Sequence, residues 1–492
     1  MVSRAVAPTW AAIVFRLPFS DAPTFARMFA PVSMQNHYAT RLTQSEIAIA
    51  TLANGLKVGV REDWMGWANR ALAAPERLRG FARIAVAVLP ALGFPLCPAD
   101  AAEPITIGLA IAQSGQLAAN GKAALVGMKI WQDDVNAKGG LLGRPVKLVY
   151  YDDQSNPANV PALYTKLLEV DKVDLIVSGY STNMIAPAMP VAMAKNKLLI
   201  GLFGTAANAS FHYANYFSMN ANGPDAKRAV TAGFFELAAA QNPKPETVAI
   251  VAADAEFGRN ASDGARDNAR DAGLRIVYDR SYPPNTTDFT PIIRAIAAAN
   301  PDVVAICSYP LDSVGMLRAI DEVGLRPKLL GGAMVGLQNA NLKSQLGPLL
   351  NGLVNYEQWL PARTLQFPGV MEFLAKYQAR AAAEGTDPIG YNMPPWGYAD
   401  LQVLEQAIAA TGSTADARLS AFLHGNTVHT IIGDIAFGPD GEWTKPRMLQ
   451  VQYRNIRGND LAQFKDMDNQ VILTPVEFRT GDLIYPMAAA RP

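Results

Sequence analysis

Short hydroxyl and amide side chains gather in the segment Ser178-Gly-Tyr-Ser-Thr-Asn183, directly after an apolar run. A segment that follows a strand and precedes a helix presents free backbone N–H groups beside such side chains, and these groups converge on an anion. Ser181, Thr182 and Asn183 are therefore candidate ligand contacts. Tyr180 would form a wall beside them. The same residue types also cap helix N-termini, and position alone favours ordinary capping.

Patterns typical of catalytic and metal sites are missing from the sequence. The four histidines, His37, His212, His424 and His429, do not have metal-ligand spacing, and neither a Gly-x-Ser-x-Gly elbow nor a phosphate-binding P-loop occurs. Asp152-Asp153 are paired carboxylates, but adjacent strand residues point to opposite faces and cannot easily share a substrate. We therefore expect no enzyme, no metal site and no cofactor.

Length and composition favour a soluble protein of several domains. The chain has 492 residues, more than one core usually holds, with 50% hydrophobic and 17% charged residues. Its 43 basic residues equal its 43 acidic residues, which argues against nucleic-acid binding. Two cysteines, Cys97 and Cys307, cannot form a disulfide framework, and Cys307 lies in an apolar run typical of a buried strand.

Residues 78–102 have the order of a secretory signal peptide. A basic stretch precedes the apolar run Ile84–Cys97, and an Ala-x-Ala cleavage pattern follows at Ala99–Ala101. The apolar run is too short and too rich in proline for a membrane-spanning helix. Because a signal peptide belongs at the start of a chain, residues 1–77 are expected to be an unstructured extension or sequence upstream of the true translation start. A genuine small domain there is the alternative.

From residue 103 onward, strand and helix patterns alternate at the spacing of βαβ units, which predicts parallel sheets. The expected strands are Ile105–Ala112, Val146–Tyr151, Leu175–Ser178, Leu198–Leu202, Thr247–Ala252, Arg275–Tyr282, Val303–Ser308 and Leu329–Gly331. The expected helices are Pro157–Val170, Pro187–Lys195, Pro224–Ala240, Gly258–Ala272, Phe289–Ala299 and Leu311–Val323. Three of these helices would begin at a proline, which the first helical turn tolerates.

The first βαβ unit has several recognisable elements. A strand at Ile105–Ala112 ends in a Ser-Gly loop, and the next helix stops at Gly139-Gly140, as a helix C-terminus should. The turn Asn136-Ala-Lys-Gly-Gly-Leu-Leu-Gly-Arg144 and the run Tyr151-Asp-Asp-Gln-Ser-Asn-Pro157 follow. This order resembles the type I periplasmic binding proteins, in particular the branched-chain amino acid receptors of ABC transporters, over about residues 105–485.

The resemblance implies two Rossmann-like lobes with parallel sheets, joined by a three-segment hinge that closes around a ligand. The first lobe would comprise residues 103–221 and 357–434. The second would comprise residues 222–356 and 435–492, including a C-terminal tail. The crossings would fall near Phe217–Gly223, Leu353–Glu357 and Ile431–Phe437.

With this resemblance, the ligand role of Ser181, Thr182 and Asn183 is favoured over capping. It also implies that the loop Leu202–Asn208 contributes to the site, although a simple glycine turn with a capping threonine is the competing interpretation. Other loops of both lobes would supply further ligand contacts. The aromatic residues among them could instead serve only in packing. These candidates are Ser114, Phe203, Gly204, Thr205, Phe257, Tyr309 and Met334.

One departure from the family pattern concerns the ligand. Amino-acid-binding relatives often carry an acidic residue near Ala333-Met334 that pairs with the ligand ammonium, and this chain has none there. Asp254, Glu256 or Asp312 would have to supply the charge from neighbouring loops, because an isolated buried charge is costly. Otherwise the ligand is a carboxylate without an amine, in an aromatic pocket that extends to Trp396.

The resemblance therefore implies a periplasmic, monomeric solute-binding protein of an ABC importer. Its ligand would be a small carboxylate, either an amino acid or an aromatic or aliphatic acid, and its partners would be the permease subunits in the inner membrane. A ligand-sensing subunit for a membrane kinase or chemoreceptor is the alternative. Neither function requires a nucleic acid, a metal or a cofactor.

Overall fold

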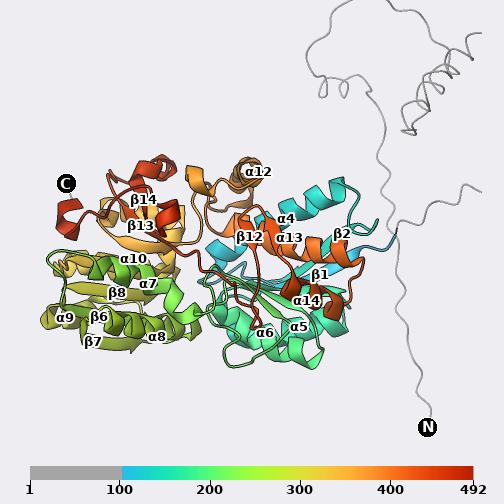
Figure 1. The fold of residues 1–492 in the computed structure, drawn as a ribbon, viewed down its shortest axis with the longest axis horizontal. Helices are drawn as coiled ribbons and strands as arrows, with labels where there is room; N and C mark the ends of the chain where they lie inside the picture. The colour runs from blue at the N-terminus through green and yellow to red at the C-terminus, as the bar shows by residue number, and fades with distance from the viewer. Residues whose placement is uncertain (1–101, 491–492) are drawn as a thin grey trace, which may run out of the picture. The chain divides into compact units, whose positions relative to one another are not determined.

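Two separate β-sheets organise residues 102–490, which are the residues that the computed structural model describes (Figure 1). The first sheet has five strands and the second has seven. We call each sheet with its covering helices a lobe. The predicted extension at 1–77 and the predicted signal peptide lie outside the described residues, apart from residue 102.

The first lobe is built on five parallel strands in the order β2-β1-β3-β4-β5. The central strands β3 and β4 are apolar runs buried on both faces, as parallel sheets require, whereas the edge strand β2 is partly exposed. The strands are β1 (Ile105–Ala110), β2 (Val146–Tyr151), β3 (Leu175–Tyr180), β4 (Leu199–Leu202) and β5 (Tyr216–Met219). The helices α4 (Ala118–Ala137), α5 (Val160–Glu169) and α6 (Thr182–Ala194) connect them.

The second lobe has the strand order β14-β13-β10-β9-β8-β6-β7. Five strands run parallel, but β13 pairs antiparallel with both β10 and β14, so this sheet is mixed. The strands are β6 (Thr247–Ala253), β7 (Arg275–Tyr282), β8 (Val303–Ser308), β9 (Leu329–Met334), β10 (Val354–Glu357), β13 (Leu449–Tyr453) and β14 (Gln470–Thr474). The helices are α7 (Ala226–Ala239), α8 (Glu256–Asp271), α9 (Thr290–Ala299), α10 (Pro310–Val323) and α11 (Ala340–Leu346).

The chain passes between the two sheets three times, because segments distant in sequence complete each lobe. Three helices between β10 and β13 pack with the first lobe, where α13 lies against α4 (Figure 1). They are α12 (Val370–Glu384), α13 (Met393–Thr411) and α14 (Asp416–Gly425). The short hairpin of β11 (Val428–Thr430) and β12 (Gly433–Ile435) follows. The two-lobed α/β fold expected from the sequence is confirmed.

Two glycines allow α4 and α13 to approach closely. A Cβ atom on Gly127 would lie 2.2 Å from the backbone oxygen of Pro394, and one on Gly397 would lie 2.5 Å from that of Ala124. No side chain fits at either position without moving a backbone. This close contact between α13 and α4 packs the helices that follow β10 against the first lobe.

The expected helix start at Pro187 is wrong. Helix α6 begins at Thr182, and both Pro187 and Pro190 lie inside it. Each proline removes a backbone N–H that would bond to the residue four positions earlier, a feature that usually ends a helix. Here the buried first turn and the packing of α6 on its lobe maintain the helix, so its N-terminus immediately follows β3.

Candidate functional site

A small pocket lies between the two lobes, at the carboxyl ends of their parallel strands. Ligands of open α/β sheets bind outside this edge. The space inside the pocket is about 330 Å³, which includes open solvent, and only about 20 Å³ of it can hold the centre of a water-sized sphere. Its lining residues are Tyr180, Ser181, Thr182, Phe203, Thr205, Asn220, Phe257, Tyr309, Val335, Tyr356 and Gln358.

Hydroxyl groups on the first lobe are oriented by their neighbours. The backbone N–H of Thr205 donates to Thr182 Oγ1 at 3.0 Å, and Asn220 Nδ2 donates to Thr205 Oγ1 at 3.3 Å. Within residues 102–490, neither hydroxyl proton has an acceptor. Since α6 begins at Thr182, its first backbone N–H groups also lack intrahelical partners. These groups can together bind an anion.

The loops that carry these groups hold unusual backbone conformations. Ser181 has φ 93°, Phe203 has φ 60° and Ala206 has φ 52°, although none of them is glycine. Left-handed conformations of such residues cost free energy and persist where the surrounding structure enforces them, often at ligand sites. Backbone hydrogen bonds provide that support here: Ser181 N donates to Leu202 O, and Phe203 N donates to Met219 O.

Aromatic rings form the apolar walls of the pocket. On the first lobe, the Tyr180 and Phe203 rings meet edge to face at 6.1 Å between centroids. On the second lobe, the Phe257 and Tyr309 rings do the same at 5.8 Å. Trp396 is fully buried behind Phe203, with 5.0 Å between the ring centroids, so it supports the wall without lining the pocket.

Two asparagines connect the lobes beside the pocket. Asn183 Oδ1 accepts hydrogen bonds from the Tyr309 hydroxyl at 2.7 Å and from the Phe257 backbone N–H at 3.2 Å. Asn260 Nδ2 donates to the backbone oxygen of Thr205 at 2.9 Å. Asn183 therefore uses its carboxamide oxygen to bridge the lobes and is not among the residues that line the pocket.

Three other predicted site residues also lie outside the lining. Ser114 is exposed, and its hydroxyl donates to Asp152 Oδ2 at 2.7 Å. Gly204 packs against Tyr216, because a Cβ atom there would lie 2.3 Å from the tyrosine hydroxyl. Met334 is fully buried, and the next residue, Val335, lines the pocket in its place.

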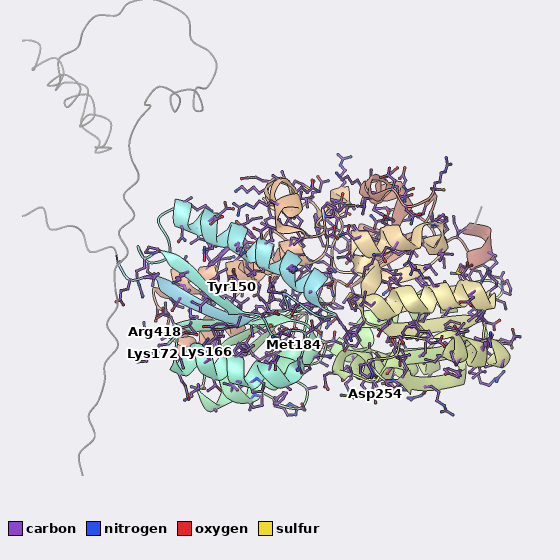
Figure 2. All side chains as sticks on the ribbon, turned by 180° about the vertical axis from the view of Figure 1, so that it is seen from behind. Tyr150, Lys166, Lys172, Met184, Asp254 and Arg418 are labelled. Atoms are coloured by element: carbon purple, nitrogen blue, oxygen red, sulfur yellow. The ribbon has the colours of Figure 1, made fainter. Side chains whose placement is uncertain are left out.

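None of the acidic residues suggested as partners for a ligand ammonium lines the pocket. Asp254 is exposed and Glu256 is half-buried, and both form ion pairs with Arg259; Figure 2 labels Asp254 on the second lobe. Asp312 is buried, but its carboxylate accepts a hydrogen bond from the Tyr282 hydroxyl. Every side chain of the lining is uncharged. Burial also raises the pKa of Tyr180, Tyr309 and Tyr356, so these phenols remain neutral.

Sequence reasoning missed four lining residues: Asn220, Val335, Tyr356 and Gln358. Three of them directly follow a strand, since Asn220 follows β5, Val335 follows β9 and Gln358 follows β10. Their position at strand ends was the available signal. It was not used for β5 and β10, because both segments were interpreted only as crossings between the lobes.

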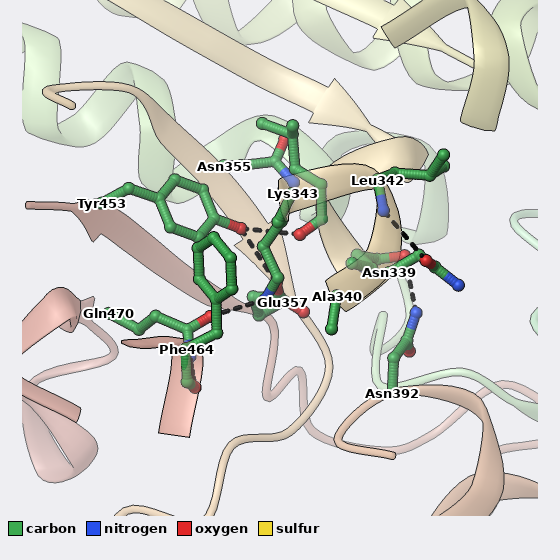
Figure 3. Close-up of polar contacts among 12 residues, drawn as sticks. Asn339, Ala340, Leu342, Lys343, Asn355, Glu357, Asn392, Tyr453, Phe464 and Gln470 are labelled. Carbon is green, nitrogen blue, oxygen red and sulfur yellow. Dashed lines mark hydrogen bonds and ion pairs between the residues drawn. The ribbon is translucent and has the colours of Figure 1, made fainter. Parts of the chain in front are cut away.

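A buried polar network lies behind the β10 part of the lining (Figure 3). The Lys343 ammonium is 3.9 Å from Glu357 Oε1 and donates to Gln470 Oε1 at 2.6 Å, while the Tyr453 hydroxyl donates to Glu357 Oε1 at 3.1 Å. Burial raises the pKa of Glu357 to about 7, although the nearby ammonium lowers it in part. The network therefore fixes the position of Glu357, which lies between the lining residues Tyr356 and Gln358.

The described residues offer no arrangement of three or more histidine, cysteine, aspartate or glutamate side chains suited to a metal ion. Over the same part of the chain, no helix combines the length and apolar character needed to cross a membrane. The lining residues themselves offer hydrogen-bonding groups and aromatic surface to a ligand.

Two α/β lobes joined by three crossings, with a small uncharged pocket between them, define the class of bilobal solute-binding proteins. The family described as "Periplasmic binding protein" matches residues 104–455. The chain belongs to this family, within its type I, branched-chain amino acid group.

Individual relatives agree with this assignment. The Leu/Ile/Val-binding protein of Escherichia coli K12 is 25% identical over 347 residues, which cover 69% of this chain and 88% of that protein. A Streptococcus pneumoniae branched-chain amino acid transporter substrate-binding protein, solved with isoleucine, has a TM-score of 0.61 and 16% identity, with 76% of this chain and 100% of that chain covered. A Rhodopseudomonas palustris solute-binding protein, solved with 3,4-dihydroxy benzoic acid, has a TM-score of 0.62 and 20% identity, with 78% and 98% covered.

Proposed function

We propose that the protein is a periplasmic, monomeric solute-binding protein of an ABC importer that captures a small organic acid without an amine. The uncharged lining of the pocket carries this proposal. A carboxylate would find neutral donors in Ser181, Thr182, Thr205 and the start of α6. An ammonium enclosed in the same pocket would have no negative partner, and burying an unpaired charge costs several kcal/mol.

The shape and chemistry of the walls support a compact, flat acid. Phe203, Phe257, Tyr309 and Tyr356 surround a small volume, and aromatic walls pack well against an aromatic ring. The Rhodopseudomonas palustris relative was solved with an amine-free aromatic acid, which supports the compatibility of this fold with such ligands. We infer that an aromatic carboxylic acid fits this chain better than a branched-chain amino acid.

Hinge closure would bring the second-lobe residues over a ligand held by the first lobe. The hinge segments would lie near the boundaries 221/222, 356/357 and 434/435, and the closed protein would dock on its permease. The hydrogen bonds of Asn183 and Asn260 across the lobes support this view, since both would break on opening. The ligand contacts that we propose are the lining residues named above.

A thermal-shift screen tests the ligand class, because a ligand that binds only the folded state raises the melting temperature. The panel pairs benzoate, 4-hydroxybenzoate and phenylacetate with leucine, isoleucine and phenylalanine. We expect stabilisation by amine-free acids. Stabilisation by the amino acids alone would overturn the proposal, since the protein would then hold an ammonium without an acidic residue in the lining.

The variant Thr205→Val tests the anion site. Because it removes one hydroxyl donor to a charged ligand, we expect the Kd for the best acid of the panel to rise roughly 10- to 100-fold. The melting temperature without ligand should fall modestly, because the Asn220 amide loses its acceptor. Thr165→Val is the matched control, since Thr165 donates to Pro161 O on the exposed face of α5. Normal binding by Thr205→Val would remove this loop from the site.

A further inference from the structure

Gln358 carries a buried hydrogen-bond acceptor that nothing in the described chain satisfies. The side chain is 4% exposed and lines the pocket, yet its Oε1 atom has no donor within residues 102–490. No other lining side chain has a fully buried polar atom without a partner. Buried polar groups are usually paired, and a ligand in the adjoining pocket can supply the partner of this atom.

The Gln358 amide is hydrogen-bonded through its nitrogen, and its oxygen remains free. Gln358 Nε2 donates to Asn220 Oδ1 at 2.8 Å, and Asn220 Nδ2 donates to Thr205 Oγ1 at 3.3 Å. Each of these two amides donates toward the first lobe. Gln358 therefore keeps its oxygen, and a carbonyl oxygen can only accept. The missing partner must be an O–H or N–H group.

Because the lining residues are uncharged, they restrict which kind of donor group the ligand can carry. An ammonium would place a full positive charge among uncharged side chains, whereas a hydroxyl satisfies the same acceptor without a charge. The donor must also lie near the ligand carboxylate. Only the side chain of Asn220 separates Gln358 from the Thr205 hydroxyl at the anion site.

We propose that Gln358 recognises a hydroxyl group on the carbon next to the ligand carboxylate, so that the preferred ligands are 2-hydroxy carboxylic acids. This inference rests on the proposed function, because it takes the carboxylate to bind at Thr182 and Thr205. It adds the functional group that separates the preferred ligand from other acids of similar size. Gln358 thereby acts as a specificity-determining residue.

Three ligands that differ at one substituent test the inference by isothermal titration calorimetry on the full chain. Mandelate carries a hydroxyl beside its carboxylate, phenylacetate carries hydrogen and phenylglycine carries an ammonium. We expect mandelate to bind roughly tenfold more tightly than phenylacetate, the effect of one additional well-placed hydrogen bond to a buried acceptor. We expect phenylglycine to bind most weakly.

The variant Gln358→Met then assigns the preference to one side chain. We expect the tenfold advantage of mandelate to disappear while phenylacetate still binds. Gln366→Met is the matched control, because Gln366 donates to Pro361 O outside the pocket. Should Gln358→Met fail to fold, Gln358→Leu replaces it, because leucine also removes the amide oxygen.

The outcomes separate the two proposals. Equal binding of mandelate and phenylacetate would overturn the inference about Gln358 and leave the amine-free acid function standing, as would a mandelate preference that survives Gln358→Met. Preferential binding of phenylglycine would overturn both. If neither acid binds while other amine-free acids of the thermal-shift panel do, the 2-hydroxy class is wrong and the function stands.

Discussion

The side chain of Asn183 shows how one residue can serve the site without touching the ligand pocket. Its carboxamide oxygen accepts two hydrogen bonds from the opposite lobe, one from Tyr309 and one from Phe257. The same two residues form an aromatic wall of the pocket. Asn183 therefore connects the arrangement of that wall to the relative position of the lobes.

Replacing Asn183 by alanine should weaken ligand binding about tenfold. The two lost hydrogen bonds stabilise the arrangement that encloses the ligand, and a smaller population of that arrangement lowers the apparent affinity in proportion. Calorimetry with the best acid of the panel measures the effect. Asn156→Ala is the control, because Asn156 also accepts from a backbone N–H but lies away from the pocket. Unchanged affinity in Asn183→Ala would contradict the bridging role.

At this scale the sequence predicted part of the site. Thr182 and Thr205 were predicted as ligand contacts because each follows a strand, where polar groups are exposed. Both residues line the pocket. Tyr356 and Gln358 were not found, because β10 and the residue after it were interpreted only as a crossing between the lobes. Ser114 has the right residue type at a strand end, but its hydroxyl is used by Asp152.

Strand β10 joins the pocket to a buried network on its other face. Successive strand residues point to opposite sides, so Tyr356 lines the pocket while the neighbouring Glu357 meets Lys343 and Tyr453 (Figure 3). Both members of the ion pair are almost fully buried. Removing one partner of such a pair leaves an uncompensated charge, which destabilises a protein more than replacing both.

We therefore expect Lys343→Met to lower the free energy of unfolding by roughly 3–5 kcal/mol. The double variant Lys343→Met, Glu357→Gln should recover much of this loss, because no charge then remains in the network. Urea unfolding of Lys343→Met, of Glu357→Gln and of the double variant measures the three values that the comparison needs. If the two changes are simply additive, Lys343 and Glu357 do not interact and the network is a set of independent contacts.

Some strands could be predicted from the sequence and others could not, for a physical reason. All eight expected strands form, and most of them are the continuous apolar runs that mark a buried parallel sheet. Strands β10 and β13 were missed because they carry polar residues, including Asn355, Gln450 and Gln452, that are nevertheless fully buried. Each of these amides donates at least one hydrogen bond to a backbone oxygen distant in sequence, as when Gln452 Nε2 donates to Ile484 O at 2.9 Å.

Across the whole molecule, several carboxyl groups are buried with raised pKa values. Burial raises the pKa of Glu442 to about 8, beside Ser218 and Asp440, and that of Glu357 to about 7. Burial also raises the pKa of Asp400 well above its usual value. In each case the folded protein binds the proton more tightly than the unfolded chain does, so protonation of these groups favours folding.

The stability of the protein should consequently fall as the pH rises. The contribution of Glu442 is complete below about pH 4.5, its unfolded pKa, and is lost as the pH approaches about 8. In Glu442→Gln, the free energy of unfolding should fall less as the pH rises. At pH 9 this variant should be more stable than the unmodified protein. Urea unfolding from pH 5 to pH 9 tests this, with the exposed Glu477→Gln as control. A variant whose stability parallels the unmodified protein at every pH would contradict the assignment.

The uncharged lining of the pocket has a consequence for kinetics. An anion that approaches a pocket without fixed charges, on a chain with formal net charge +0, gains little from electrostatic steering. Dissolved salt slows association by screening fixed charges, so the association rate should depend little on salt concentration. Arrival of the ligand would then be governed by diffusion and lobe opening. Discrimination between similar acids would reside in how long each one stays bound.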